Sequence, residues 1–132
     1  MPETGPGEDG MSLLIALAAA TVTATCVPSA NPAETREEVV DSFFAAMAKH
    51  DAAAMGRYVK PGARMMMGSD SMDLAEMLSA INPNTTLTVL DKTFNQDKTI
   101  TVHFSTVTGD DRDDAAASIA QEGGCITSVT HV

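Results

Sequence analysis

The sequence contains few aromatic residues, which limits what its core can be made of. Only 4% of the 132 residues are aromatic and none is Trp, whereas 44% are hydrophobic. Such a core is built mainly from Ala, Val, Ile, Leu and Met. The length is enough for one modest core, so we expect a single domain.

Positive charge is also scarce. The chain has 8 Lys and Arg residues against 18 Asp and Glu residues, which gives a formal net charge of −10. Phosphate backbones and anionic membranes are bound mainly through basic patches, and the sequence has none. The composition therefore argues against nucleic acid and anionic membrane surfaces as partners.

Long hydrophobic runs are absent apart from one near the N-terminus. Residues 11–27 carry no charge but are diluted by Ser and Thr, and a membrane-spanning helix needs about 20 mostly apolar residues. The run is typical of the hydrophobic part of a signal peptide, although acidic residues precede it. We predict a leader and linker over residues 1–32, removal of the first 24 to 26 residues on export, and a domain over residues 33–132. A buried or frayed N-terminal helix is the alternative.

The two cysteines leave two possibilities open. Cys26 ends the uncharged run, as a lipid-modified cysteine would, so the exported protein is expected to be periplasmic or membrane-anchored at Cys26. Cys26 and Cys125 can instead pair, provided that Cys26 remains in the mature chain. Cys125 alone is interpreted as a small strand residue, because the sequence supplies no evident base for a nucleophile.

The first predicted helix lies within residues 33–51. Thr35 and Glu38 have the spacing of a capping box, in which each side chain satisfies a free backbone N–H of the other residue. The apolar residues that follow recur every three or four positions, so one face of this helix should pack on a core.

Two shorter helices are predicted after it. Asp51 is expected to cap one over residues 51–59, which the following Pro-Gly pair ends. Residues 63–67 should form a short strand. Asp73 then begins the third helix, over residues 73–81.

The pattern changes to strands after residue 84. Thr, Val and Ile alternate in segments separated by turn residues, and we expect an antiparallel meander with strands at residues 85–94, 98–108, 114–121 and 125–132. In the second strand Ile100 and Val102 share an apolar face, whereas His103 lies on a polar one.

Residues 36–66, REEVVDSFFAAMAKHDAAAMGRYVKPGARMM, and residues 121–132, QEGGCITSVTHV, resemble the nuclear transport factor 2-like (NTF2-like) superfamily, in particular its SnoaL-like bacterial members. The resemblance covers roughly residues 33–132. It implies an α+β, cone-shaped fold in which three N-terminal helices pack on a curved antiparallel sheet and enclose an apolar pocket. It also implies a homodimer through the outer face of the sheet.

Methionine is abundant, and five of the nine methionines lie within residues 65–77. Strand alternation would put Met65 and Met67 on one face and Met66 on the other, so the three cannot converge on one ion. Met fills irregular apolar spaces well, so we expect a pocket lining, with no metal and no cofactor. A Cu(I) site completed by Met72 or Met77 is the alternative. The predicted ligand-binding residues are Phe43, Met47, Tyr58, Met65 and Met67.

Catalytic residues are harder to identify. The resemblance extends to ketosteroid isomerases, which use an Asp base with a Tyr and a protonated Asp. The corresponding Tyr falls near Phe43 and the base near Met67, and neither residue transfers a proton. The remaining candidates are Asp41 on the first helix and the neighbouring-strand residues Asp91 and His103, each of which also suits a solvated surface position.

Two functions follow from these observations. The favoured one is a non-catalytic pocket domain of the cell envelope that binds a small apolar ligand or a protein partner. The alternative is a small SnoaL-type lyase, isomerase or hydrolase that uses Asp41, Asp91 or His103. The two differ in whether two or more ionisable side chains point into one enclosed cavity.

Overall fold

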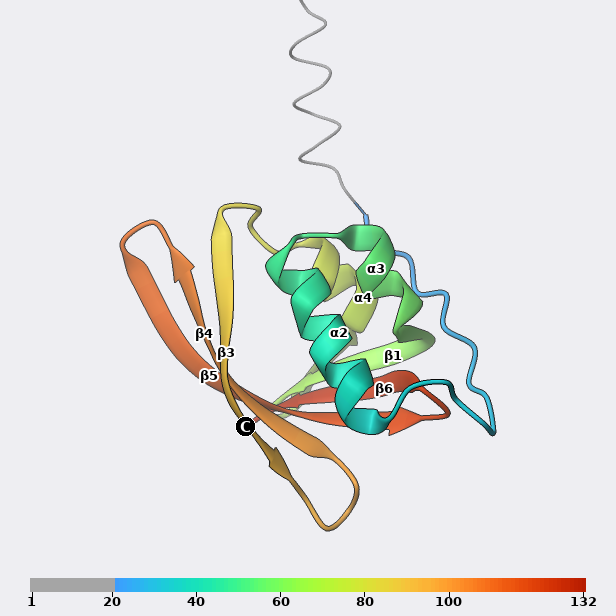
Figure 1. Cartoon of the computed structure of the whole chain (residues 1–132). Coiled ribbons are helices and arrows are strands. Elements are labelled where there is room, and N and C mark those ends of the chain that lie inside the picture. Colours follow the sequence, from blue (N-terminus) through green and yellow to red (C-terminus); the bar gives the residue numbers. More distant parts are fainter. Residues whose placement is uncertain (1–20) are drawn as a thin grey trace, which may run out of the picture.

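A computed structural model describes residues 21–132, in which three helices lie on one side of a six-stranded sheet (Figure 1). The predicted leader up to residue 20 lies outside the described residues. The sheet order is β2-β1-β6-β5-β4-β3. The strands are β1 (Val59–Met67), β2 (Asp70–Asp73), β3 (Thr85–Phe94), β4 (Ile100–Thr108), β5 (Asp111–Glu122) and β6 (Cys125–His131).

Strands β3 to β6 form the predicted antiparallel meander. The turn between β5 and β6 consists of Gly123 and Gly124, which have φ angles of 56° and 85°. Tight hairpins need positive φ at such positions, and Gly reaches these angles without a steric penalty.

Strand β1 differs from its prediction. It starts at Val59 rather than at residue 63, and it pairs in parallel with β6, so the sheet is mixed rather than fully antiparallel. Pro61 and Gly62 lie inside this strand, where its register with β6 shifts between Val59 and Arg64. An irregularity of this kind accommodates Pro61, which has no backbone N–H, and Gly62, which has a φ of 89°. Strand β2, which pairs with β1, was not predicted.

The three helices begin where the capping residues predict. Thr35 Oγ1 accepts from the N–H of Glu38, whose carboxylate accepts from the N–H of Thr35, so the capping box is confirmed. Asp51 and Asp73 cap the other two helices. The third helix follows β1 and β2, so the expectation of three N-terminal helices is not confirmed. The helices are α2 (Arg36–Ala48), α3 (Ala52–Arg57) and α4 (Leu74–Ser79).

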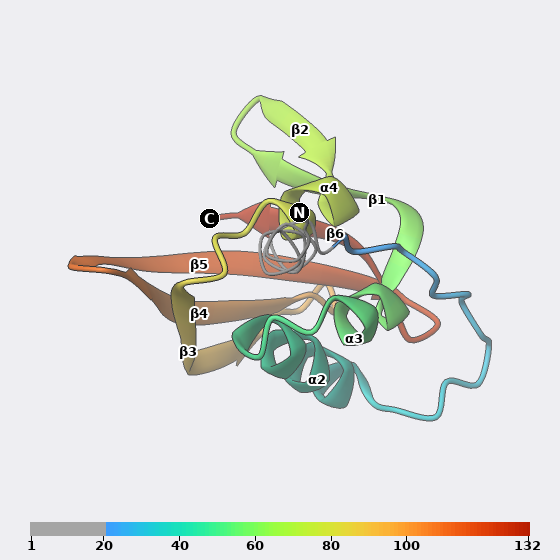
Figure 2. The same ribbon diagram turned by 90° about the horizontal axis from the view of Figure 1, so that it is seen from above.

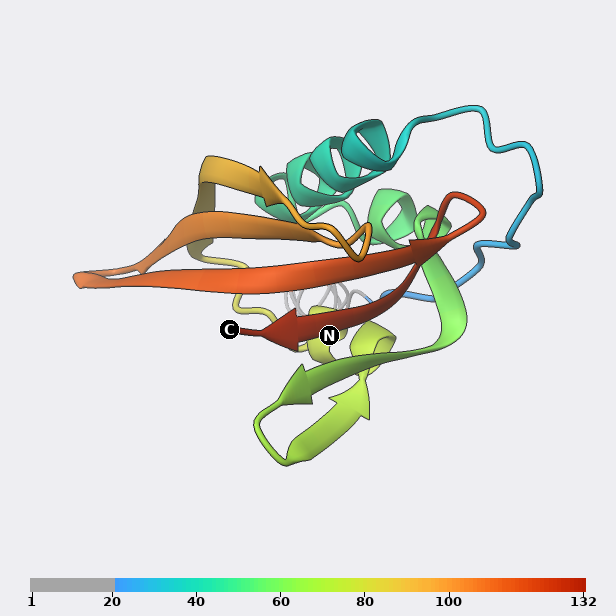
Figure 3. The ribbon, with the colours of Figure 1, turned by 90° about the horizontal axis from the view of Figure 1, so that it is seen from below.

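The sheet is curved, and the helices lie inside its curve (Figures 1 and 2). Figure 3 views the molecule from below, opposite to Figure 2, and in this view the strands lie in front. Ile100 and Val102 of β4 are buried and His103 is exposed, as the alternation predicts. Burying one large apolar side chain stabilises the fold by about 1.5–3 kcal/mol. The largest fully buried side chains are those of Val39, Val40, Phe43, Val59, Leu74, Val102, Ile119, Cys125 and Ile126.

Residues 22–29, here called the strap, pack on the domain although the sequence analysis assigns them to the leader and linker. The side chain of Val22 belongs to the core, and only 4% of this residue is exposed. The N–H of Val22 donates to Ser79 Oγ over 2.9 Å, and the N–H of Thr25 donates to the carbonyl oxygen of Gly56 over 2.9 Å. The strap is therefore attached to both α3 and α4.

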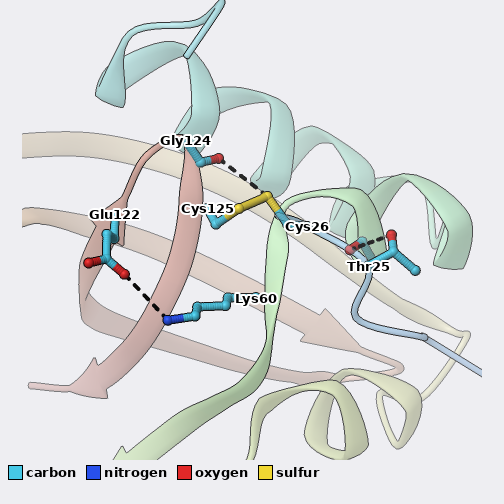
Figure 4. Close-up of a disulfide and its surroundings, with 7 residues drawn as sticks. Thr25, Cys26, Lys60, Glu122, Gly124 and Cys125 are labelled. Carbon is cyan, nitrogen blue, oxygen red and sulfur yellow. Dashed lines mark hydrogen bonds and ion pairs between the residues drawn. A yellow bond between two sulfur atoms is a disulfide. The ribbon is translucent and has the colours of Figure 1, made fainter. Parts of the chain in front are cut away.

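A disulfide joins Cys26 of the strap to Cys125, the first residue of β6 (Figure 4). The N–H of Cys26 also donates to the carbonyl oxygen of Val59 over 3.1 Å, and the N–H of Ser29 donates to that of Gly123 over 3.0 Å. The strap is thus fixed to the sheet by one covalent bond and by backbone hydrogen bonds.

Two glycines allow the strap to approach this closely. A Cβ atom on Gly56 would lie 2.0 Å from the carbonyl oxygen of Thr23, and one on Gly123 would lie 2.5 Å from the backbone nitrogen of Ser29. No side chain fits at such distances, so both positions require Gly as long as the strap is bound.

Candidate functional site

An apolar cavity of about 220 Å³ lies between the curved sheet and the helices α2 and α4. Helix α2 contributes Phe43, Phe44 and Met47, and helix α4 contributes Leu74, Met77 and Leu78. The sheet contributes mainly apolar side chains, among them Met65, Phe104, Ala117 and Ile119. A cavity of about 150 Å³ is enough to bind benzene in another protein, so this one has room for a somewhat larger ring system.

The few aromatic side chains of the protein are concentrated at this cavity. Three of the four phenylalanines line it, and their rings are in contact. The ring centroids of Phe43 and Phe44 lie 5.8 Å apart, and those of Phe44 and Phe104 lie 5.6 Å apart. Aromatic rings are rigid and present a large apolar area, so they suit the wall of a binding site.

Of the predicted ligand-binding residues, Phe43, Met47 and Met65 line the cavity, whereas Tyr58 and Met67 do not. Tyr58 follows α3, and its hydroxyl donates to Glu34 Oε2 over 3.4 Å. This residue lies near the segment that follows the strap rather than at the cavity.

Met67 lies outside the cavity because β1 continues beyond the helices. It pairs with Asp70 at the end of the β1–β2 hairpin, and 47% of it is exposed. Met66 and Met72 are also exposed, at 40% and 38%. Alternation correctly separates Met65 from Met66, but it does not reveal where the cover of the sheet ends.

Asp41 is part of a surface ion-pair cluster rather than of the cavity. Its Oδ1 atom lies 2.6 Å from Lys92 Nζ, which also contacts Glu37 Oε2 over 2.7 Å. The hydrogen bond to Asp41, followed by that to Glu37, raises the pKa of Lys92 above its usual value of 10.5. This cluster connects α2 to β3.

Asp91 and His103 meet, as expected for neighbouring strands, but outside the cavity. Asp91 Oδ1 lies 2.7 Å from His103 Nδ1, and the two side chains are 67% and 47% exposed. They line a shallow groove together with Asp114 and His131. Water screens charges at such exposed positions, so this pair lacks the enclosure that acid–base catalysis uses.

The structure adds polar residues to the cavity that the sequence analysis did not select, namely His50, Thr85, Thr106 and His131. Nε2 of His50 lies 2.6 Å from the carbonyl oxygen of Thr85. Alternation could have identified Thr106 and His131, which share a face with the apolar residues two positions earlier, Phe104 and Val129.

Among residues 21–132, no three His, Cys, Asp or Glu side chains are grouped as ligands of a metal ion. In the same part of the chain, no helix is both long enough and apolar enough to span a membrane.

No family model matches this sequence, and no curated protein matches it either. Solved structures do match. The chain is similar to an NTF2-like protein of unknown function from Cytophaga hutchinsonii, with a TM-score of 0.63 and 14% identity over 74% of this chain and 88% of that one.

Two further structures have the same architecture. An uncharacterized cystatin fold protein from Novosphingobium aromaticivorans has a TM-score of 0.65 and 16% identity, over 75% of this chain and 98% of that one. A hypothetical protein with a ketosteroid isomerase-like fold from Catenulispora acidiphila, in complex with trimethylamine, has a TM-score of 0.55 and 18% identity, over 74% and 86%. The chain therefore has an NTF2-like fold with a curved, largely antiparallel sheet.

Proposed function

We propose that this chain is a small-molecule-binding domain of the cell envelope, which holds an apolar ligand between α2, α4 and the sheet. The main support for this proposal is the cavity of about 220 Å³, whose walls are largely apolar. Protein interiors are normally packed without spaces of this size, and an empty apolar cavity costs stability. A bound apolar ligand would restore the missing contacts.

Binding is favoured over catalysis because of the groups around the cavity. Its lining residues among the described part of the chain include two histidines but no Asp or Glu. The His50 ring contacts a backbone carbonyl, so no carboxylate at the described cavity lining is paired with it to stabilise a protonated imidazole. His50 and His131 are two ionisable side chains at one cavity, which is the feature expected of the catalytic alternative, so a SnoaL-type lyase, isomerase or hydrolase is the second candidate.

We further propose that the protein is exported. The Cys26–Cys125 disulfide supports this, because disulfides persist in oxidising compartments. The same sulfur cannot carry a lipid, so the periplasmic form is favoured over a membrane anchor at Cys26. Since Val22 is part of the core, we place any processing site before residue 22 rather than at residues 24 to 26. The intact mass of the mature protein tests this, and a mature N-terminus after Val22 would contradict it.

A homodimer through the outer face of the sheet stays a prediction. This face includes the exposed Asp91–His103 pair, and Leu90 beside it is 51% exposed. Analytical ultracentrifugation of the wild type and of a Leu90→Glu variant would test it. A monomeric wild type at high protein concentration would contradict it.

The ligand-binding proposal can be tested with a cavity-filling variant and a matched control. Ala117 lies on the cavity floor, whereas the adjacent Ala116 faces the groove on the other side of the sheet. We expect Ala117→Leu to weaken the binding of 2-methylnaphthalene about tenfold or more, because it occupies space that the probe would bury. Ala116→Leu should leave binding unchanged. No binding to the wild type, or equal effects of both variants, would contradict the proposal.

A further inference from the structure

Three of the four polar residues of the cavity, His50, Thr85 and Thr106, lie near one another, whereas His131 pairs with Ala117 of β5 and lies apart from them. His50 follows α2, Thr85 begins β3, and His50 contacts the Thr85 carbonyl. Thr106 of β4 pairs with Leu87, two positions along β3 from Thr85, so it lies diagonally across from Thr85 on the same face of the sheet. In Figures 1 and 2 the end of α2 lies near the start of β3. The largely apolar cavity therefore has a polar side formed by His50, Thr85 and Thr106.

His50 occupies a backbone position that Gly usually fills. Its φ is 55°, in the left-handed region. Its N–H donates to the carbonyl oxygen of Met47, and the N–H of Asp51 donates to that of Ala46, each over 3.0 Å. This pair of hydrogen bonds is the common way to end an α-helix, and Gly is favoured there because it has no Cβ. A histidine at this position places an imidazole beside the cavity at the expense of backbone strain.

The hydrogen bond of the ring fixes which nitrogen can receive a ligand. A carbonyl oxygen only accepts, so Nε2 of His50 carries the proton in its contact with Thr85. In the neutral ring Nδ1 is then an acceptor. No partner of Nδ1 is found among the described residues.

Thr106 supplies the complementary group. Its hydroxyl can donate and accept, and no hydrogen-bond partner of it is found in the described part of the chain. A hydroxyl group on a ligand could therefore donate to Nδ1 of His50 and accept from Thr106. The carboxyl groups of Asp and Glu are missing from the described cavity lining, so no side chain there competes as a strong acceptor.

We propose that His50, together with Thr106, selects apolar ring compounds that carry one hydroxyl group, such as phenols or cyclic alcohols of about two rings. This inference rests on the proposed ligand-binding function and specifies its ligand class. The apolar walls bind the ring system, and the polar side formed by His50, Thr85 and Thr106 binds the hydroxyl group. His50 is thus a residue that determines specificity.

The test compares two probes that differ in one group, 2-naphthol and 2-methylnaphthalene, by calorimetric titration of the full chain. We expect the wild type to bind 2-naphthol about five to ten times more tightly, which is the effect of one net hydrogen bond. In His50→Gly most of this preference should be lost, because only Thr106 remains to contact the hydroxyl group. Loss of the apolar contact with the His50 ring would affect both probes alike and leave the ratio of their affinities unchanged. Gly suits the φ of 55°, so this variant should fold.

Two more variants make the result specific. Thr106→Val keeps the shape of the side chain and removes its hydroxyl, and it should reduce the preference for 2-naphthol. His103→Ala, on the outer face, is the matched histidine control and should retain the full preference. If both probes bind but His50→Gly keeps the preference, the inference about His50 is wrong and the binding function stands. If neither probe binds the wild type, both proposals fail.

Discussion

The strap side and the cavity side of this domain are built in opposite ways. On the strap side, a disulfide, backbone hydrogen bonds and two close glycine contacts hold residues 22–29 against the domain. On the cavity side, Met65 and Met77 border about 220 Å³ of unfilled space, and His50 holds a strained backbone angle. A small domain buries little apolar surface, and an unfilled cavity reduces its packing contacts further. We infer that the strap side supplies stability that the cavity side lacks.

The largest expected effect is that of the disulfide. Cys26 and Cys125 are 99 residues apart, so their cross-link restricts almost the whole unfolded domain. The chain-entropy relation gives about 4 to 5 kcal/mol for a loop of this length, which is a large part of the stability of a small domain. We expect the double variant Cys26→Ser, Cys125→Ser to lose that much free energy of unfolding in denaturant titrations. Reduced wild-type protein is the control and should match it; a loss below about 1 kcal/mol would show that the strap side is not the more stable one.

A smaller effect is expected at Gly56. An added Cβ would meet Thr23 at 2.0 Å, so Gly56→Ala should displace the strap and cost about 2 kcal/mol. Gly56 lies in α3, where Ala alone would be favoured by about 1 kcal/mol.

Gly56→Ala in the disulfide-free variant separates the effect of the clash with Thr23 from the effect of helix propensity. If the strap has already detached there, Gly56→Ala should become neutral or stabilising in thermal unfolding. An equal loss in both backgrounds would mean that the contact with the strap is not the cause.

Met65→Ala is expected to cost less than a substitution in closely packed core. Removing a buried Met or Ile side chain usually costs about 2 to 5 kcal/mol, part of which comes from the new cavity. Met65 already borders a cavity, so we expect about 1 to 2 kcal/mol. Ile126→Ala, at a fully buried site near the disulfide, is the comparison and should fall within the usual range. Equal losses would show that the cavity side is packed as well as the strap side.

Local features of the fold could be predicted from the sequence, because they depend on residues close together in the chain. The helix caps at Thr35, Asp51 and Asp73 involve partners three positions away, and all three are confirmed. The parallel pairing of β1 with β6 joins residues about 65 positions apart, and no local pattern encodes it.

The same distinction holds for the candidate site. Helical periodicity and alternation place Phe43, Met47 and Met65 at the cavity. They do not show that the β1–β2 hairpin extends past the helices, so Met67 was misplaced. His50 was not selected because a histidine after a helix has no sequence signal that separates a cavity position from a solvated one.

The smallest effect on stability is expected for His50→Gly, on the cavity side. Relief of the left-handed backbone favours Gly by about 1 to 2 kcal/mol. The added flexibility of the unfolded chain costs about 0.5 to 1 kcal/mol, and loss of the His50–Thr85 hydrogen bond costs about as much again. These terms nearly cancel, so the free energy of unfolding should change by less than about 0.5 kcal/mol in denaturant titrations. A loss above about 1.5 kcal/mol would show instead that His50 is needed to hold α2 against β3. A glycine substitution that leaves stability unchanged while removing most of the preference for a hydroxyl group would mean that, unlike Gly56 in its contact with the strap, His50 serves the ligand rather than the fold.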